Sequence, residues 1–146
     1  MPDQKYPEPT VGALIFNPEG KILLVRSHKW KDKFTIPGGH VELGETLKTA
    51  VVREAKEETG LDVHDPQFLC YQEFIHGENF WKKRHFIFFD FVCRTEDGEV
   101  VLNDEAEEYL WVNPEEAYQY PIDPYLGHAL DRYLGREDDS GGENRE

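Results

Sequence analysis

The sequence has few cysteines and no long apolar run. Its 146 residues include two cysteines, Cys70 and Cys93, which cannot build a disulfide framework and lack the spacing of a zinc site. We expect both to be reduced, buried, small apolar side chains in a cytoplasmic protein. The longest apolar stretch, Phe86–Cys93, is interrupted by Asp90 and is too short to span a bilayer, and residues 1–9 lack the apolar core of a signal peptide. Neither a membrane anchor nor an export signal is therefore expected.

Basic residues are also scarce. Lys and Arg number 16 against 30 Asp and Glu, which gives a formal net charge of −14. Such a surface repels the backbone of a nucleic acid polymer and an anionic membrane, so neither is expected as a partner. An acidic protein that handles phosphate therefore needs metal cations to offset the repulsion.

Turn residues divide the chain into short strands. Asn17-Pro18-Glu19-Gly20 joins two β-rich runs, which predicts a hairpin. Pro37-Gly38-Gly39 is expected to break the strand that follows the hairpin. Strands are expected at 10–16, 21–26, 34–36, 68–74, 84–94 and 108–112.

Helical segments lie between and after these strands. They are expected at 46–59, at 125–134 and at a first turn opened by Pro114. The segment 46–59 has no Gly or Pro and is followed by Gly60, a typical C-terminal stop. Strands on both sides of a helix predict an α/β protein with a mixed β-sheet packed between helices. We expect one domain at 1–135 and an acidic, disordered tail at 136–146.

The expected helix at 46–59 carries a cluster of carboxylates. Glu54, Glu57 and Glu58 occupy positions i, i+3 and i+4, within roughly a 100° arc of one face. A Glu-rich helix is ordinarily a solvated face, but these glutamates continue an apolar row formed by Leu47 and Ala50. Converging carboxylates of this kind suit a hard divalent cation, Mg²⁺ or the alternative Mn²⁺, rather than zinc.

The glycines before the helix predict a tight turn that brings backbone close to a ligand. Gly39 and Gly44 have the spacing of a phosphate-binding P-loop. However, Glu45 and Thr46 stand where that motif needs Lys and Ser or Thr. A P-loop is therefore excluded.

The same segment resembles the signature of the Nudix hydrolases. Gly39, five residues, Glu45, seven residues and then the run Arg53–Leu61 (REAKEETGL), which includes Gly60, match that signature in spacing. Ala55 departs from it, because the family more often has Leu, Ile or Val there. The signature covers about a sixth of the chain. The resemblance implies a Nudix-like α/β/α sandwich with a mixed β-sheet between helices.

The resemblance also implies roles for individual residues. The family's metal-ligand glutamates match Glu54, Glu57 and Glu58. Gly38 matches the position whose backbone carbonyl often joins them, and Arg53 and Glu45 match a pair that braces the loop onto the helix through a salt bridge.

Many members draw one more carboxylate from a loop shortly before a Trp-containing strand. Glu105, six residues before Trp111, is chosen here. A solvated loop is the competing interpretation of this acidic run, and the alternative ligands are Asp104, Glu107 and Glu108.

The implied reaction is metal-assisted hydrolysis of a diphosphate linkage, usually in a nucleoside diphosphate joined to another group. Cations neutralise phosphate charge and lower the pKa of the attacking water, and a carboxylate accepts its proton. Glu54 is the first candidate for this base and Glu105 the second. Some proteins of this fold bind nucleotides without hydrolysing them, but all the ligand glutamates are present here, which favours an enzyme.

Two segments combine aromatic and basic residues that suit a nucleotide, 27–34 and 79–85. Exposed loops with packed aromatics are the alternative interpretation. The substrate-binding candidates are Arg26, Trp30, His40, Trp81, Arg84 and Asp90. For Asp90 we expect either contact with a base or sugar or a pair with a basic side chain, because it lies among phenylalanines.

The substrate is expected to be a small nucleotide. Markers that the family uses for ADP-ribose, dinucleoside polyphosphate and coenzyme A derivatives are missing from their usual places. A nucleoside triphosphate, ranked slightly first, and a nucleoside-diphosphate sugar remain. The oligomeric state stays open, with a homodimer among the alternatives.

Overall fold

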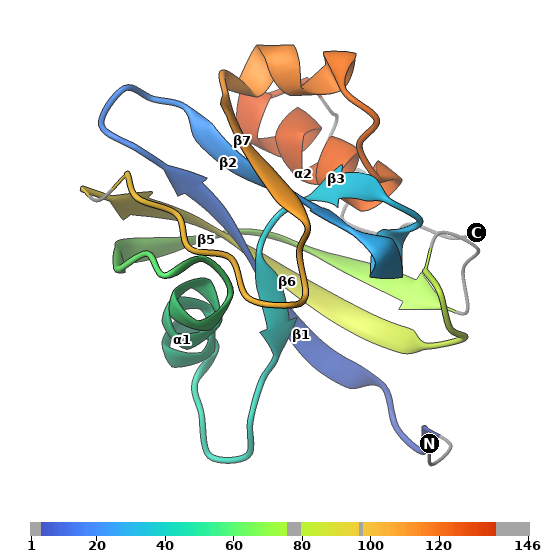
Figure 1. Ribbon diagram of the computed structural model, residues 1–146. Helices are drawn as coiled ribbons and strands as arrows, with labels where there is room; N and C mark the ends of the chain where they lie inside the picture. The colour runs from blue at the N-terminus through green and yellow to red at the C-terminus, as the bar shows by residue number, and fades with distance from the viewer. Residues whose placement is uncertain (1–3, 76–79, 97, 137–146) are drawn as a thin grey trace.

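The computed structural model describes residues 4–75, 80–96 and 98–136, and Figure 1 shows a twisted sheet with helices on both faces. The sheet has seven strands, β1 (Glu8–Phe16), β2 (Ile22–Ser27), β3 (Lys33–Thr35), β4 (Gly38–His40), β5 (Val63–Ile75), β6 (His85–Thr95) and β7 (Glu108–Val112). The helices are α1 (Leu47–Thr59), α2 (Pro124–Leu134) and two 3₁₀ helices, η1 (His28–Trp30) and η2 (Pro114–Gln119).

The strand order is β3-β2-β1-β6-β5, and β4 and β7 pair with β1 and β2. The β1–β6 pair is parallel and the others are antiparallel, so the sheet is mixed as predicted. The segment that contains α1 connects β4, which pairs with β1, to β5, which pairs with β6. Strands β1 and β6 are far apart in the sequence but lie side by side in the sheet.

Alternating side chains of β1 and β2 build two apolar layers. Val11, Ala13 and Ile15 face a core that includes α1, whereas Leu14 and Phe16 face a second core that includes α2. The period of two in a strand places neighbouring residues on opposite faces. The predicted α/β/α arrangement is therefore confirmed.

The local signals at the ends of α1 agree with its predicted limits. The Thr46 hydroxyl accepts a hydrogen bond from the Thr49 N–H at 3.1 Å, and α1 begins at the next residue after Thr46. Gly60 follows α1 with a φ of 75°, in the left-handed region that favours glycine. The predicted strands are confirmed with shifted limits, and β5 begins earlier than expected.

The predicted break of the strand at Pro37-Gly38-Gly39 is confirmed, because β3 ends at Thr35. The prediction did not include a further strand, but Gly38 and Gly39 pair with β1 as β4. A Cβ at Gly38 would overlap the Val11 carbonyl oxygen, so the absence of a side chain allows this close pairing. The strand carries the turn directly onto the sheet beneath α1.

Cys70 and Cys93 are buried, as predicted, and no disulfide joins them. No helix within the described ranges is long and apolar enough to cross a membrane. The predicted acidic tail lies outside the described residues except for Arg136, so its disorder stays a prediction.

Candidate active site

Glu58 lies on the inner face of α1 and is buried. Its Oε2 atom accepts a hydrogen bond from the backbone N–H of Gly38 at 2.7 Å. Burial raises the pKa of Glu58 to about 8, helped by the charges of Glu105 and Glu54, while the Gly38 N–H and Lys29 act in the opposite direction. A carboxylate in this position is therefore costly to ionise without a cation nearby.

Glu54 lies one turn earlier on the same helix, against the glycine strand. A Cβ at Gly39 would overlap its carboxylate, so glycine allows the carboxylate to lie where it does. Burial raises the pKa of Glu54, the neighbouring Glu57 and Glu105 add to the shift, and Arg53 opposes it.

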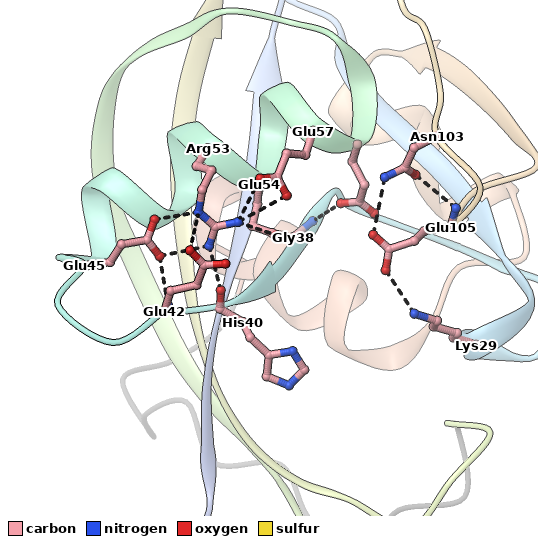
Figure 2. Close-up of polar contacts among 11 residues, drawn as sticks. Lys29, Gly38, His40, Glu42, Glu45, Arg53, Glu54, Glu57, Asn103 and Glu105 are labelled. Carbon is pink, nitrogen blue, oxygen red and sulfur yellow. Dashed lines mark hydrogen bonds and ion pairs between the residues drawn. The ribbon is translucent and has the colours of Figure 1, made fainter. Parts of the chain in front are cut away.

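Arg53 ties the glycine turn to α1, as Figure 2 shows. Its Nε and Nη2 atoms donate to the two carboxylate oxygens of Glu45 at 2.6 and 2.9 Å, and Nη2 also donates to the His40 carbonyl at 2.9 Å. This forked contact lowers the pKa of Glu45 to about 2. The predicted salt bridge between Arg53 and Glu45 is therefore present.

Arg53 also contacts the carboxylates of its own helix. Nη1 lies 3.2 Å from Glu54 Oε1 and 3.3 Å from Glu57 Oε1. The Glu57 side chain is 55% exposed, compared with 12% for Glu54, so Glu57 is the outer member of the three signature glutamates.

Glu105 approaches the same region from the loop between β6 and β7. Its Oε1 atom is 3.0 Å from Lys29 Nζ, and its backbone N–H donates to Asn103 Oδ1 at 3.0 Å. The Asn103 N–H donates to the Glu58 carbonyl at 3.2 Å, which ties this loop to the end of α1. Figure 2 shows Glu105 between Asn103 and Lys29.

The alternatives to Glu105 lie elsewhere. Glu107 and Glu108 pair with Arg26, at 3.5 and 2.6 Å from its guanidinium nitrogens. Among the four acidic candidates, only Glu105 lines the cavity that Glu58 also lines.

Carboxylate oxygens are the ligands that a divalent cation prefers, but these side chains do not yet surround a common point. In the described part of the chain, no group of three His, Cys, Asp or Glu side chains already converges around one point. The charge of Glu105 nevertheless raises the pKa of both Glu54 and Glu58, and the charge of Glu54 raises the pKa of Glu58 further, which is the repulsion that a cation relieves. These three, with Glu57 at the rim and the Gly38 carbonyl, are the residues that could hold a metal ion.

A cavity lies beside two of these carboxylates, Glu58 and Glu105. Gly38 and Gly39 line it next to them. Its other lining residues are aromatic, aliphatic and polar in comparable numbers. The aromatic ones are Trp30, Phe80, Phe86, Phe88 and Tyr125, and the polar ones include Asp90, Gln72 and Asp123.

A second, more open groove adjoins the cavity and shares part of its wall. Its lining contains Trp81 and several cationic or basic side chains, namely Lys5, Lys29, His40, Lys82 and Arg84. In a chain of net charge −14, this groove gathers much positive charge beside the carboxylate end of the cavity.

Comparison with known proteins identifies the family. The NUDIX domain model matches residues 6–133. The chain belongs to the Nudix hydrolase family. It is therefore a pyrophosphohydrolase that acts on acid anhydrides, in a family that generally needs divalent metal ions and acts on small nucleotides.

Relatives within the Nudix family are distant. The chain is 30% identical over 104 residues to the nucleoside triphosphatase NudI of Salmonella schwarzengrund, over 67% of this chain and 74% of that one. It is 36% identical over 96 residues to an ADP-ribose pyrophosphatase of Methanocaldococcus jannaschii, over 64% of this chain and only 55% of that one. The crystal structure of a MutT protein from Methanosarcina mazei superposes with a TM-score of 0.74 at 27% identity, over 92% of this chain and 98% of that one.

The structure separates the six candidates for substrate contact in this Nudix protein. Trp30 and Asp90 line the cavity, Trp81 and Arg84 line the groove, and His40 lines both. Arg26 lines neither, because the pairing of β2 with β7 places it beside Glu107 and Glu108.

Several cavity residues were not among the predicted site residues. Lys29 belongs to the basic segment recognised in the sequence, but its contact with Glu105 joins positions 76 residues apart and has no local signal. Gln72 gives no signal either, being one polar residue in a strand. Asp123 could have been found, because an aspartate directly before a proline is a typical N-cap signal.

Proposed function

We propose that this Nudix protein hydrolyses a phosphoanhydride bond of a nucleoside diphosphate derivative in the presence of a divalent cation, with a nucleoside triphosphate slightly favoured as substrate. One observation carries the proposal. The signature carboxylate Glu58 and the loop carboxylate Glu105 line a cavity whose wall also includes five aromatic side chains. Such a cavity can hold phosphates at the carboxylate end and a base between the rings.

The cation would be Mg²⁺, or alternatively Mn²⁺, held by Glu54, Glu57, Glu58, Glu105 and the Gly38 carbonyl. When bound, it supplies the positive charge that the phosphates require and lowers the pKa of the attacking water. The chain's own residues hold this set in place. Arg53 fixes the glycine turn against α1, and the Gly38 N–H orients the Glu58 carboxylate.

A carboxylate must also accept the proton of the attacking water. Glu54 remains the first candidate, because it is partly buried and its raised pKa increases its proton affinity. Glu105 is the second candidate, because it lies at the cavity end and Lys29 holds it there at 3.0 Å.

The basic groove supports a second candidate substrate, a nucleoside-diphosphate sugar. Trp81, Lys82 and Arg84 line a space next to the phosphate end, where the group on the far side of the cleaved bond would lie. Lys82 Nζ lies 4.4 Å from the centre of the Trp81 ring, so charge and apolar surface occur together. A non-catalytic nucleotide-binding role is the remaining alternative.

We also infer the setting of the reaction. The net charge of −14 favours small nucleotides over nucleic acid polymers or anionic membranes as partners. Two buried cysteines that form no disulfide suit action in the reducing cytoplasm.

A nucleotide panel tests the proposal. Formation of nucleoside monophosphate is measured for nucleoside triphosphates and nucleoside-diphosphate sugars, with Mg²⁺ and with excess EDTA. The co-product is diphosphate from a triphosphate and a sugar phosphate from a sugar derivative, and release of single phosphate from triphosphates is followed in parallel. We expect Mg²⁺-dependent turnover that is highest for a triphosphate. Turnover highest for a sugar derivative would favour the second candidate, and nucleotide binding without turnover would leave the non-catalytic role.

A further inference from the structure

The aromatic residues of the cavity form one cluster, called here the aromatic pocket. Its walls are the rings of Trp30, Phe80, Phe86, Phe88 and Tyr125. Trp30 lies 4.8 Å from Phe80 and 6.1 Å from Tyr125 between ring centroids, so rings from distant segments pack against one another beside the cavity. The whole cavity, including the part beside Glu58 and Glu105, has a volume of about 170 Å³.

Two buried aspartates interrupt these aromatic walls. Asp90, on β6, is 5% exposed, and Asp123, at the start of α2, is 1% exposed. Their negative charges are close enough for Asp123 to raise the pKa of Asp90, although burial is the larger cause. Burial of two carboxylates beside aromatic rings lowers the stability of the fold. Their presence is therefore explained most simply by a role in binding.

The hydrogen-bond partners of Asp90 are neutral side chains. Its Oδ2 atom accepts from Gln72 Nε2 at 2.9 Å and from Cys70 Sγ at 3.7 Å. Gln72 Nε2 also donates to the Tyr125 carbonyl at 2.9 Å, which links β5, β6 and α2. Among the described residues no Lys, Arg or His pairs with Asp90, so the expected alternative of a basic partner is wrong.

Asp123 has one carboxylate oxygen to spare. Its Oδ1 atom caps α2 by accepting from the N–H groups of Tyr125 and Leu126 at 2.8 and 3.1 Å. Its Oδ2 atom is buried with no hydrogen-bond partner of ordinary geometry in the described ranges, although the Thr35 side chain lies near it. A buried acceptor without a donor is a binding determinant for a ligand that brings one.

We propose that Asp90 and Asp123 select a purine base with adjacent N–H donors, a 2-amino-6-oxopurine of the guanine type, held between the aromatic rings. This inference rests on the proposed function, because it assigns the base of the same nucleotide. Carboxylates accept hydrogen bonds, and guanine presents its ring N1–H beside its 2-amino group. Adenine and cytosine place an unprotonated ring nitrogen beside their amino group, and uracil places carbonyl oxygens on both sides of its N–H. Those acceptors would face the carboxylates and be repelled.

Binding of monophosphates tests the base without the reaction. GMP and IMP differ only in the 2-amino group, and neither contains an anhydride bond. Isothermal titration of the full chain with each, in the absence of divalent metal, measures the selectivity. We expect GMP to bind at least about tenfold more tightly than IMP, because a hydrogen bond to a charged group is lost. Equal affinities, or no binding of either nucleotide, would overturn the proposal.

Variants show whether the aspartates cause the selectivity. Asp90→Asn and Asp123→Asn should each reduce the ratio of GMP to IMP affinity to about threefold or less. Asparagine also caps helices, so Asp123→Asn is expected to fold, and Asp90→Asn decides the matter if it does not. Asp62→Asn, an exposed aspartate paired with Lys56, is the matched control and should keep the wild-type ratio. A ratio that stays at the wild-type value in Asp90→Asn would contradict the assignment.

The outcome is independent of hydrolysis. A preference for GMP without turnover of any triphosphate would remove the proposed function and leave the base pocket standing. Turnover of triphosphates without a preference for GMP over IMP would do the reverse.

Discussion

Arg53 joins the glycine turn, the loop acid Glu45 and both Glu54 and Glu57 of α1 through one guanidinium group. The planar fork matches both oxygens of Glu45, a geometry that an ammonium group cannot reproduce. Its place in the structure is therefore that of a brace, which is a role distinct from contact with the reacting phosphate.

We expect Arg53→Lys and Arg53→Ala to lower both the melting temperature and kcat. Arg53→Ala leaves Glu45 unpaired, and Arg53→Lys replaces the fork with a single ammonium group, so the melting temperature should fall in both and further in Arg53→Ala. Thermal unfolding and steady-state kinetics measure the two effects, with Arg94→Lys as a control on an exposed arginine. Lost activity at an unchanged melting temperature would instead place Arg53 on the phosphate.

Asp90 predicts how stability depends on pH. Burial raises its pKa from 3.8 to about 7, so the folded protein binds this proton more tightly than the unfolded chain does. The contribution of Asp90 to the free energy of unfolding should therefore fall as pH rises from about 4 to about 7, by at most about 4 kcal/mol.

The Asp90→Asn variant removes this dependence. Urea unfolding at pH 5 and pH 8 should show that the variant gains stability relative to the wild type at the higher pH. A difference between the two proteins that does not change with pH would contradict the raised pKa.

At the scale of elements, strand β4 brings Gly39 directly against Glu54. The Gly39→Ala substitution must displace either the strand or the carboxylate. A shift of about 1 Å in a catalytic group can cost roughly 10²-fold in rate, so a loss of this size in kcat/KM is expected.

Gly98→Ala provides the matched control, because a Cβ at that position meets nothing within 4 Å. It should keep wild-type kinetics and a wild-type melting temperature. Full activity in Gly39→Ala would show that the close contact with Glu54 has no part in the reaction.

The sequence predicts those elements whose signals are local. Thr46 and Gly60 define the ends of α1 through their own hydrogen bonds and backbone angles, and the turn at 17–20 defines a hairpin. The pairing of β4 with β1 could not be predicted, because it depends on a close approach to Val11 that nothing in the turn sequence indicates.

At the scale of the whole molecule, the net charge of −14 is combined with a carboxylate cluster. We expect Mg²⁺ to raise the melting temperature beyond the effect of NaCl at equal ionic strength. Binding to the folded state alone adds about 2.7 kcal/mol at 100 times the dissociation constant. Differential scanning fluorimetry checks this, and equal effects of Mg²⁺ and NaCl would argue against a specific site.

Only part of the candidate site is predictable from the sequence, because some of its residues are neighbours on one helix and others meet only in the folded chain. The signature glutamates lie on one helix, so their spacing in the sequence reports their proximity. The aromatic pocket draws Trp30 from η1, Phe88 from β6 and Tyr125 from α2, and these residues meet only after the sheet has formed. Arg26 is expected at the site from its place in the sequence, but the pairing of β2 with β7 puts it beside Glu107 and Glu108 instead.

The central claim is that the buried glutamate of α1 takes part in metal-dependent hydrolysis. The most direct measurement is kcat/KM of Glu58→Gln on the best substrate of the panel, with the exposed Glu19→Gln as the control. The substitution keeps the shape of Glu58 and removes its charge, so we predict a loss of at least about 10²-fold in a folded protein, while the control stays within about twofold of the wild type. Wild-type kcat/KM in Glu58→Gln would contradict the claim.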